Sequence, residues 1–411
     1  MATRTISNAG GNYNSTATWV EGIVPTSADD IVATATSGQL TVNVASAAAS
    51  FNFTNYTNTL TVNALWTVAG TSKTQTFVSG MTIAGTNYIY LNSATTIVTN
   101  GLTIPNLRFG TGNKTLNDNL NTVNFWCITG ISIIGTRTWN NSGDWLGNGI
   151  TVVVGTDITL NLTGTGTITG MSVQFDTVNI NTSGTLTLVL GYGVAIWIKS
   201  PANNQPAKFN YISGTITGDT VLRMEPGTHA NSLFYLDVAG INWKQVVCSN
   251  VSVSVNLHEI TLLSDLNFDK LNLGVLISSS INTAFKYRIT GPGRLVGGKV
   301  NYNTAYGLPL LTTLKPNLEL GSTASHVVEQ LYAFCDDGEF GSISSQTAST
   351  TAYFGVTSTQ SIANIDFTDI DASAGPISVF RSNLTRTTAI TNYNTLSGGG
   401  GVSGGSWTFV N

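Results

Sequence analysis

The sequence predicts an all-β chain that forms a right-handed parallel β-helix, a β-solenoid with about 20 residues per rung. The first observation is a repeat, because Leu-Thr-Val-Asn occupies 40–43 and returns at 60–63. Threonines followed by Val or Ile then recur at a nearly constant spacing, at Thr41, Thr61, Thr82, Thr103 and Thr122. Within each repeat, apolar and polar residues alternate as in a strand, which favours a β-solenoid over a helical repeat.

The composition suits long stacks of similar side chains. Of the 411 residues, 41% are hydrophobic and only 9% are charged, whereas an average soluble domain has roughly 25% charged residues. Few charges fit a ladder of like neighbours, because equal charges opposite each other repel. The chain has no cluster of Lys and Arg and no long apolar run. We therefore expect neither nucleic-acid binding nor insertion into a membrane.

The chain divides into four predicted parts. Residues 1–30 are rich in turn residues and form an N-terminal cap, in which Trp19 covers the apolar end of the first rung. Residues 31–258 form the β-solenoid. Residues 259–394 continue it or form a less regular β-rich region. Residues 395–411 contain a Gly-rich tether and a terminal strand.

Three segments carry more specific predictions. Residues 137–149 contain Asn, Ser and Gly and are expected to form a loop at a corner of the solenoid. Residues 251–260 alternate as a half-exposed strand, with Leu257 on the apolar face and His258 on the polar face. Residues 322–334 have apolar residues at helical spacing and predict one short helix.

The strongest catalytic candidate is a group of three acids, Asp366, Asp369 and Asp371. Asp369 and Asp371 would share one face of a strand, where paired carboxylates could bind calcium or act as an acid and a base. Aspartates at a solvated strand edge, which discourage edge pairing, explain the same pattern and are favoured. We therefore assign no catalytic residue and expect no enzyme activity.

No cofactor or metal site is expected. The sequence has no phosphate-binding loop and no nucleophile motif, and its three histidines lack ligand spacing. The three cysteines are far apart, which fits neither a disulfide framework nor a zinc site. Cys127, Cys248 and Cys335 are expected to be reduced and buried.

One segment suggests binding of a glycan. Trp139 and Trp145 flank three polar residues, Asn140, Asn141 and Asp144. Indole faces next to amides and a carboxylate could stack on a sugar ring and bind its hydroxyls. The alternative, in which both indoles fold back over the solenoid as buried Trp usually does, is favoured.

The stretch GGNYNSTATWVEGIVPTSADDIV, residues 10–32, carries a resemblance to a known class. Its fitting positions are Gly11, Trp19, Gly22, Pro25 and Asp30, while Tyr13 stands where the class usually has Trp. The N-terminal segment 1–65 resembles the opening of β-helical virion structural proteins of aquatic tailed phages, an opening shared with bacterial β-helical surface adhesins.

The resemblance implies a non-enzymatic structural component of a virion, such as a tail fibre, an appendage or a receptor-contacting protein. Its expected partners are other copies in a homotrimer, other virion proteins and a host surface glycan. Because the chain begins without a secretory signal, we expect assembly in the host cytoplasm. A capsid-decorating protein, a polysaccharide-degrading tailspike and a bacterial surface adhesin remain alternatives.

Overall fold

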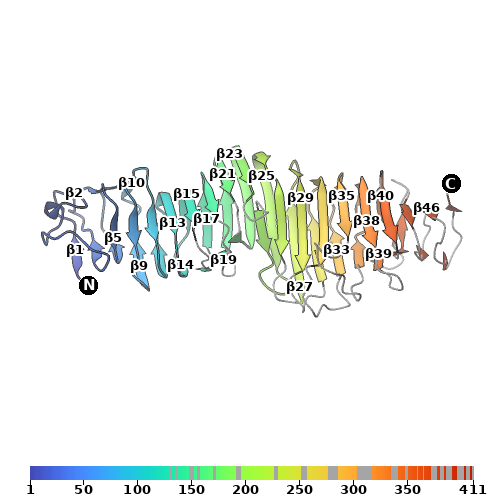
Figure 1. Ribbon diagram of the computed structural model, residues 1–411, viewed down its shortest axis with the longest axis horizontal. Coiled ribbons are helices and arrows are strands. Elements are labelled where there is room, and N and C mark those ends of the chain that lie inside the picture. The colour runs from blue at the N-terminus through green and yellow to red at the C-terminus, as the bar shows by residue number, and fades with distance from the viewer. Residues whose placement is uncertain are drawn as a thin grey trace. The chain divides into compact units, whose positions relative to one another are not determined.

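The computed structural model is an all-β structure of parallel strands stacked in register (Figure 1), as the sequence predicts. It contains, among the described residues, 48 strands, the short 3-10 turn η1 (Thr16–Thr18) and no α-helix. The described residues are 1–128, 132–135, 137–147, 152–154, 158–169, 173–190, 196–225, 230–250, 257–275, 286–302, 317–334, 341–347, 350–358, 360–363, 365–371, 377–379, 384–385, 391–395, 402–403 and 408–409.

The chain forms two compact units. Unit 1 comprises Met1–Ile196 and Ile212–Asp219, and unit 2 comprises Trp197–Tyr211 and Thr220–Asn411. Each unit is built from ladders of parallel strands that succeed one another from rung to rung.

Unit 1 has three ladders. The first contains β1 (Thr3–Thr5), β3 (Asp30–Val32), β6 (Ser50–Asn52), β9 (Lys73–Thr76), β12 (Thr95–Val98), β14 (Lys114–Leu116), β16 (Ser132–Ile134), β19 (Val152–Val154) and β22 (Val173–Gln174). The second contains β2 (Gly11–Asn12), β4 (Leu40–Val42), β7 (Thr59–Val62) and β10 (Thr82–Ala84). The third contains β5 (Ser46–Ala48), β8 (Trp66–Val68), β11 (Ile89–Leu91), β13 (Thr103–Phe109), β15 (Leu120–Cys127), β17 (Arg137–Asn141), β18 (Trp145–Gly147), β20 (Ile158–Leu162), β21 (Gly166–Thr169) and β23 (Thr177–Val189).

The strands of unit 2 form corresponding ladders. The first contains β25 (Pro206–Gly218, of which the first part belongs to this unit), β27 (Asn231–Asp237), β30 (Leu257–Leu262), β33 (Lys286–Thr290), β36 (Asn317–Leu320), β39 (Gly341–Ser345), β42 (Ile365–Thr368), β45 (Leu384–Thr385) and β47 (Val402–Ser403). The second contains β24 (Ile196–Lys199), β26 (Val221–Glu225), β29 (Gln245–Asn250), β32 (Lys270–Val275), β35 (Lys299–Tyr302), β38 (Gln330–Phe334) and β41 (Gln360–Ala363). The third contains β28 (Asn242–Trp243), β31 (Leu266–Phe268), β34 (Leu295–Val296), β37 (Ser325–Val328), β40 (Ala352–Val356) and β43 (Ile370–Asp371), and a short fourth contains β44 (Ile377–Val379), β46 (Thr391–Thr395) and β48 (Thr408–Phe409).

The first repeat that the sequence predicts is a stacked pair of strands. Strands β4 and β7 pair so that Leu40 faces Leu60 and Val42 faces Val62. These four side chains are at most 1% exposed, so the apolar positions of the repeat line the interior. Later repeats shift in register. Thr122 pairs with Ile104 and not with Thr103, and this shift of one residue buries the Thr122 side chain. Thr82 pairs with Thr59 and not with Thr61; a shift of two residues leaves the same side chains facing inward.

The rungs of unit 2 are longer than the predicted period. In unit 1 the ladder of β5 and β8 pairs Ser46 with Trp66, which matches that period. In unit 2 the ladder of β30 and β33 pairs Leu257 with Lys286, a clearly wider separation along the chain. The same ladder runs on beyond residue 258, so the described strands of 259–394 continue the solenoid with longer connections.

Three local predictions are wrong. The expected loop at 137–149 contains β17 and β18, which continue the ladder of β15. The expected helix at 322–334 is instead β37 and β38, because pairing with β34 and β35 outweighs the helical spacing. In the predicted strand 251–260, the described residues face the opposite way from the prediction. His258 is buried and Leu257 is half-buried, while residues 251–256 lie outside the described residues.

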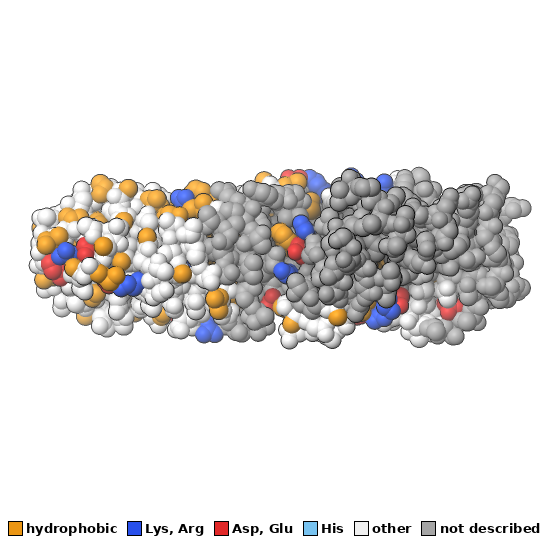
Figure 2. All heavy atoms as spheres, turned by 60° about the horizontal axis from the view of Figure 1, so that its bottom comes forward, with side chains coloured by type: hydrophobic (Ala, Val, Ile, Leu, Met, Phe, Trp, Pro, Cys, Tyr) orange, Lys and Arg blue, Asp and Glu red, His pale blue; other side chains and the backbone are white. Residues whose placement is uncertain are grey.

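Outward-facing asparagines link the rungs of unit 1. Asn140 donates its amide to the side-chain oxygen of Asn121 at 2.7 Å, Asn161 to Asn140 at 2.7 Å, and Asn179 to Asn161 at 2.8 Å. Asn140 and Asn161 therefore each donate toward the preceding rung and accept from the next one. Neutral amides can stack in this way where like charges would repel. This explains how a chain with so few charges keeps polar walls, and Figure 2 shows few charged side chains over the described N-terminal part.

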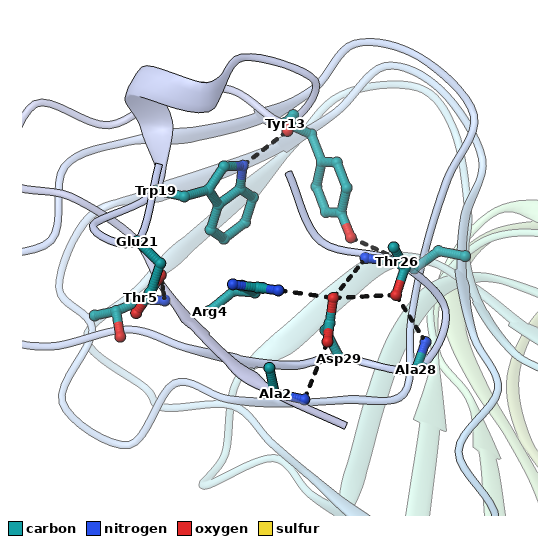
Figure 3. Close-up of polar contacts among 10 residues, drawn as sticks. Ala2, Arg4, Thr5, Tyr13, Trp19, Glu21, Thr26, Ala28 and Asp29 are labelled. Atoms are coloured by element: carbon teal, nitrogen blue, oxygen red, sulfur yellow. Dashed lines mark hydrogen bonds and ion pairs between the residues drawn. The ribbon is translucent and has the colours of Figure 1, made fainter. Parts of the chain in front are cut away.

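The predicted cap, residues 1–30, contributes strands as well as turns. Strands β1 and β2 pair with β3 and β4. Trp19 is buried, as predicted, and its indole N–H donates to the carbonyl oxygen of Tyr13 at 2.9 Å (Figure 3). The Tyr13 ring lies edge-on to that of Trp19 and 6.5 Å from that of Trp66 in β8, which joins this segment to the core.

A buried carboxylate fixes the N-terminal strand. Asp29 accepts hydrogen bonds from the backbone N–H of Ala2 and from both the N–H and the hydroxyl of Thr26, each at 3.0 Å, with Arg4 at 3.5 Å (Figure 3). The Thr26 amide above all, with the other donors, lowers the pKa of Asp29 to about 2.

Candidate functional site

The predicted sugar-stacking residues lie in the interior of unit 1. Trp139 and Trp145 are fully buried, with ring centroids 5.0 Å apart, and both pack against Phe125. Their faces are covered by protein, so neither indole is open to stack on a sugar ring in this structure. The favoured alternative, burial of both indoles, describes their position, because β17 and β18 point these two side chains inward.

The three polar residues of that segment have structural partners. Asn140 belongs to the asparagine ladder. Asn141 is buried and accepts a hydrogen bond from the Thr122 hydroxyl at 2.8 Å. The Asp144 carboxylate accepts the backbone N–H of Thr167 at 2.8 Å. The structure therefore uses these groups to bind neighbouring rungs.

The acidic cluster is not arranged as a pair on one strand face. Asp366 lies in β42 and Asp371 in β43, while Asp369 sits at the corner between these strands with φ of 55° and is buried. The backbone carbonyl of Asp369 accepts the N–H of Ala352. Within the described residues, no group of three or more His, Cys, Asp or Glu side chains could hold a metal ion.

Cys127 is buried in unit 1, and Cys248, His258 and His326 are buried in unit 2. Cys127 and Cys248 are at most 2% exposed, while Cys335 and His229 lie outside the described residues. The Nδ1 atom of His258 lies 3.5 Å from the Cys248 sulfur, and Nδ1 of His326 accepts the N–H of Leu295 at 3.1 Å.

Burial sets the protonation of both histidines. It lowers the pKa of His258 to about 3 and that of His326 to about 4. Both imidazoles are therefore neutral core groups at neutral pH, buried away from any substrate that a general base would have to reach.

A hollow on the wall of unit 2, here called the corner groove, gathers polar side chains from successive rungs. It lies where the ladder of β28, β31, β34 and β37 turns into the ladder of β29, β32, β35 and β38, and its volume is about 450 Å³. Ligand sites commonly have volumes of roughly 300–1,000 Å³. The polar lining comes from Asn242, Asn267, Asp269, Lys270, Lys299, Glu329 and Gln330.

Two glycines open the middle of the groove. At the corner, the rung of Asp269 and the rung of Glu329 each present a carboxylate, whereas the rung between them has Gly297 and Gly298. Gly298 has φ of 53°, and a Cβ there would collide with the carbonyl oxygen of Phe268. The chain can pass this closely over the preceding rung only without a side chain. The two carboxylates therefore flank a gap.

Several side chains of the groove keep their hydrogen-bonding capacity open. Asn272 and Asn301, on the same wall two residues beyond the lysines, bind each other at 2.7 Å. Asn242 and Asn267 face each other across neighbouring rungs, yet within the described part of unit 2 their amides make no such bond. Asp269 likewise has no ion pair or side-chain hydrogen bond with a described residue. Donors and acceptors that the fold leaves open are available to a polar ligand.

The groove residues form a repeat in the sequence, but this repeat is visible only when the segments are aligned at the longer rung length of unit 2. The segments NFDKLNL (267–273), LVGGKVNY (295–302) and VVEQLYAF (327–334) repeat one corner and one strand at the longer rung spacing of unit 2. Aligned on that longer period, they place Lys270, Lys299 and Gln330 in one column.

Comparison with known proteins adds no relative. No protein-family model, curated protein or solved structure matches this chain. None of the described segments forms a helix with the length and hydrophobicity that a membrane span requires.

Proposed function

We propose that this protein is a non-enzymatic structural component of a phage particle, a tail fibre or other receptor-contacting appendage, that binds a host surface saccharide in the corner groove. The observation that carries the proposal is a set of polar side chains in the groove, those of Asp269, Asn242 and Asn267, that bind no other side chain among the described residues. A sugar ring offers hydroxyls that both donate and accept hydrogen bonds, which carboxylates, amides and ammonium groups complement. Most of the residues that line the groove carry polar side chains, which supports a polar ligand.

The assignment to a virion is supported by the resemblance of residues 10–32 and by the stacked solenoid, whose rungs give a repetitive and rigid wall. The proposal includes assembly into a homotrimer with other virion proteins as partners. Light scattering coupled to size exclusion should then give three times the chain mass of 43.2 kDa. A single-chain mass would favour a module held by another protein, such as a capsid decoration.

Glycan-array binding of the full chain tests the groove. Asp269→Asn should weaken binding at least tenfold, because one exposed acceptor of the groove loses its charge. Asp237→Asn is the matched control, since Asp237 ends β27 on the wall of the same unit and does not line the groove. Equal binding by the two variants would contradict the proposal.

The same incubation separates binding from catalysis. New reducing ends on the bound polysaccharide would favour the polysaccharide-degrading tailspike over a structural protein. Bound, intact polysaccharide is the expected result.

A further inference from the structure

We infer that the outer wall of unit 1 carries a second binding site, in which Arg108 binds the carboxylate of an acidic sugar, a uronate. The site consists of Tyr90, Arg108 and Trp126, here called the Arg108 stack, which are partners on the successive strands β11, β13 and β15 (Figure 1). It shares no residue with the corner groove of unit 2, and the inference does not depend on saccharide binding there.

The guanidinium of Arg108 lies between two aromatic rings. Its Cζ atom is 4.5 Å from the centroid of the Tyr90 ring and 4.0 Å from that of the Trp126 ring. Attraction between the cation and the two π systems stabilises this sandwich. Because rings flank the cation on both sides, a ligand can reach it only from the outer surface of the wall.

Other contacts fix both rings in place. The Tyr90 hydroxyl donates to the side-chain oxygen of Asn92 at 2.7 Å, and the Trp126 ring meets that of Tyr88 edge-on, with centroids 5.7 Å apart. Gly110 makes room for Tyr90, because a Cβ there would lie 2.6 Å from the Tyr90 hydroxyl oxygen. The site is therefore formed before a ligand binds, which lowers the entropic cost of binding.

Arg108 differs from the other described Lys and Arg side chains of unit 1, which all have polar partners. Arg4 and Lys73 pair with aspartates at 3.5 Å and 3.0 Å. Lys114 donates to three backbone carbonyls, each at 2.8 Å, and Arg137 donates to a backbone carbonyl at 2.7 Å. Arg108 makes no hydrogen bond or ion pair with any described residue.

A half-buried cation without a partner favours an anionic ligand. The Nε–H of Arg108 is buried without an acceptor, so the donors open to a ligand are the two terminal nitrogens, Nη1 and Nη2. Their parallel N–H groups match the two oxygens of a carboxylate. Such a bidentate pair is stronger and more directional than a contact with a single ammonium group.

The surroundings of the stack favour a sugar as the carrier of the carboxylate. The amide nitrogen of Asn92 donates to no described residue and can bind a ring hydroxyl. A nucleic acid or an acidic peptide has closely spaced charges and needs several cations, whereas Arg108 is a single one. Burial and the nearby Asp144 carboxylate raise the pKa of Tyr88 on the same wall, and Asp144 would repel a dense polyanion. A uronate carries one charge on each ring.

Saturation-transfer NMR on the full chain tests the inference. One carboxylate–arginine pair with few other contacts gives a weak site, with a dissociation constant of roughly 1 mM, which this method detects and a washed glycan array does not. The probes are the methyl glycosides of galacturonate, glucuronate and mannuronate, each as the free acid and as its methyl ester. Measurements in the Asp269→Asn background weaken any contribution from the corner groove. At least one acid should bind about tenfold more tightly than its ester.

Arg108→Gln should lower acid binding to the level of the ester, and Arg108→Lys should lose most of the preference, because an ammonium group lacks the fork. Lys208→Gln is the matched control, since it removes one positive charge at an exposed position of β25 in unit 2 and should leave acid binding unchanged.

Equal binding of acid and ester, or unchanged acid binding in Arg108→Gln, would overturn the inference. Displacement of the acid by an equal concentration of hexaglutamate would overturn it in favour of a protein partner. Binding of none of the acids would overturn it as well, whatever the glycan array shows for the corner groove.

Discussion

Lowering the pH from 7.5 to 5 should destabilise unit 2 far more than unit 1. All three histidines of the chain belong to unit 2, and the two described ones are buried. Their folded-state pKa values, about 3 for His258 and about 4 for His326, lie below the ordinary value of 6.5. Folding therefore favours the neutral imidazoles. Their stability contribution is complete above pH 6.5 and is lost as the pH falls toward the folded pKa, because the unfolded chain takes up protons first.

The size of the effect follows from the distance between pH 5 and the unfolded pKa. pH 5 lies about 1.5 units below the unfolded pKa, so the imidazole is mostly protonated in the unfolded chain and almost unprotonated in the folded one. This difference lowers the free energy of unfolding by about 2 kcal/mol for each histidine. The two sites together should lower the free energy of unfolding of unit 2 by about 4 kcal/mol. A loss of this size is a large part of the stability of an ordinary domain.

Hydrogen exchange read by mass spectrometry at several pH values, corrected for intrinsic exchange, resolves the two units. His326→Asn is the matched variant, because its side-chain oxygen can accept the N–H of Leu295 as Nδ1 does but does not titrate. This variant should lose about half of the pH dependence, even if it is less stable at pH 7.5. Equal protection of unit 2 at pH 7.5 and pH 5, or the same pH dependence in His326→Asn, would refute the reasoning.

Three further substitutions test other parts of the structure. Asp29→Asn should lower the free energy of unfolding by about 1–3 kcal/mol at pH 7. The difference should vanish as the pH falls from about 4 to 2, since the pKa of Asp29 is lowered to about 2; denaturant melts at each pH measure it. Asn161→Ala removes two amide bonds of the ladder and should cost about 2 kcal/mol in the same melts, whereas no loss would show that water replaces them. Gly298→Ala should cost about 1–3 kcal/mol and abolish saccharide binding, and unchanged affinity would place the ligand elsewhere.

The sequence predicts the solenoid because its main signal is local and repeated. Leu40 and Leu60 fall one rung apart, and their apolar neighbours alternate at the strand period. The register further along could not be read in the same way. Threonines are so common that the repeat aligns Thr82 with Thr61, whereas in the structure its partner is Thr59. A shift of two residues keeps the inward face and leaves no trace in the hydrophobic pattern.

The candidate site could not be predicted from the sequence, because it depends on contacts between residues of neighbouring rungs. In the sequence, Trp139 and Trp145 lie beside Asn140 and Asn141, whose side chains look solvated, and the segment therefore predicts a corner loop. In three dimensions these polar groups bond to the neighbouring rungs, which allows the indoles to turn inward. In the corner groove, by contrast, residues that are distant in the sequence come together. Lys270 and Lys299 are distant in the sequence and become neighbours only once the length of the rung is known.

The direction of the asparagine ladder has a consequence for how such a protein can change its size. The amides of Asn140, Asn161 and Asn179 all donate toward lower residue numbers, so the rungs of Asn140 and Asn161 each present an amide oxygen on one side and an amide N–H on the other. Excising one rung, for example the residues from Asn140 up to Asn161, would bring together two ends that are already complementary. Gene duplications and deletions in units of one rung would thus create no new kind of junction, and unit 1 could be lengthened or shortened in steps while the two ends and their attachments stay unchanged.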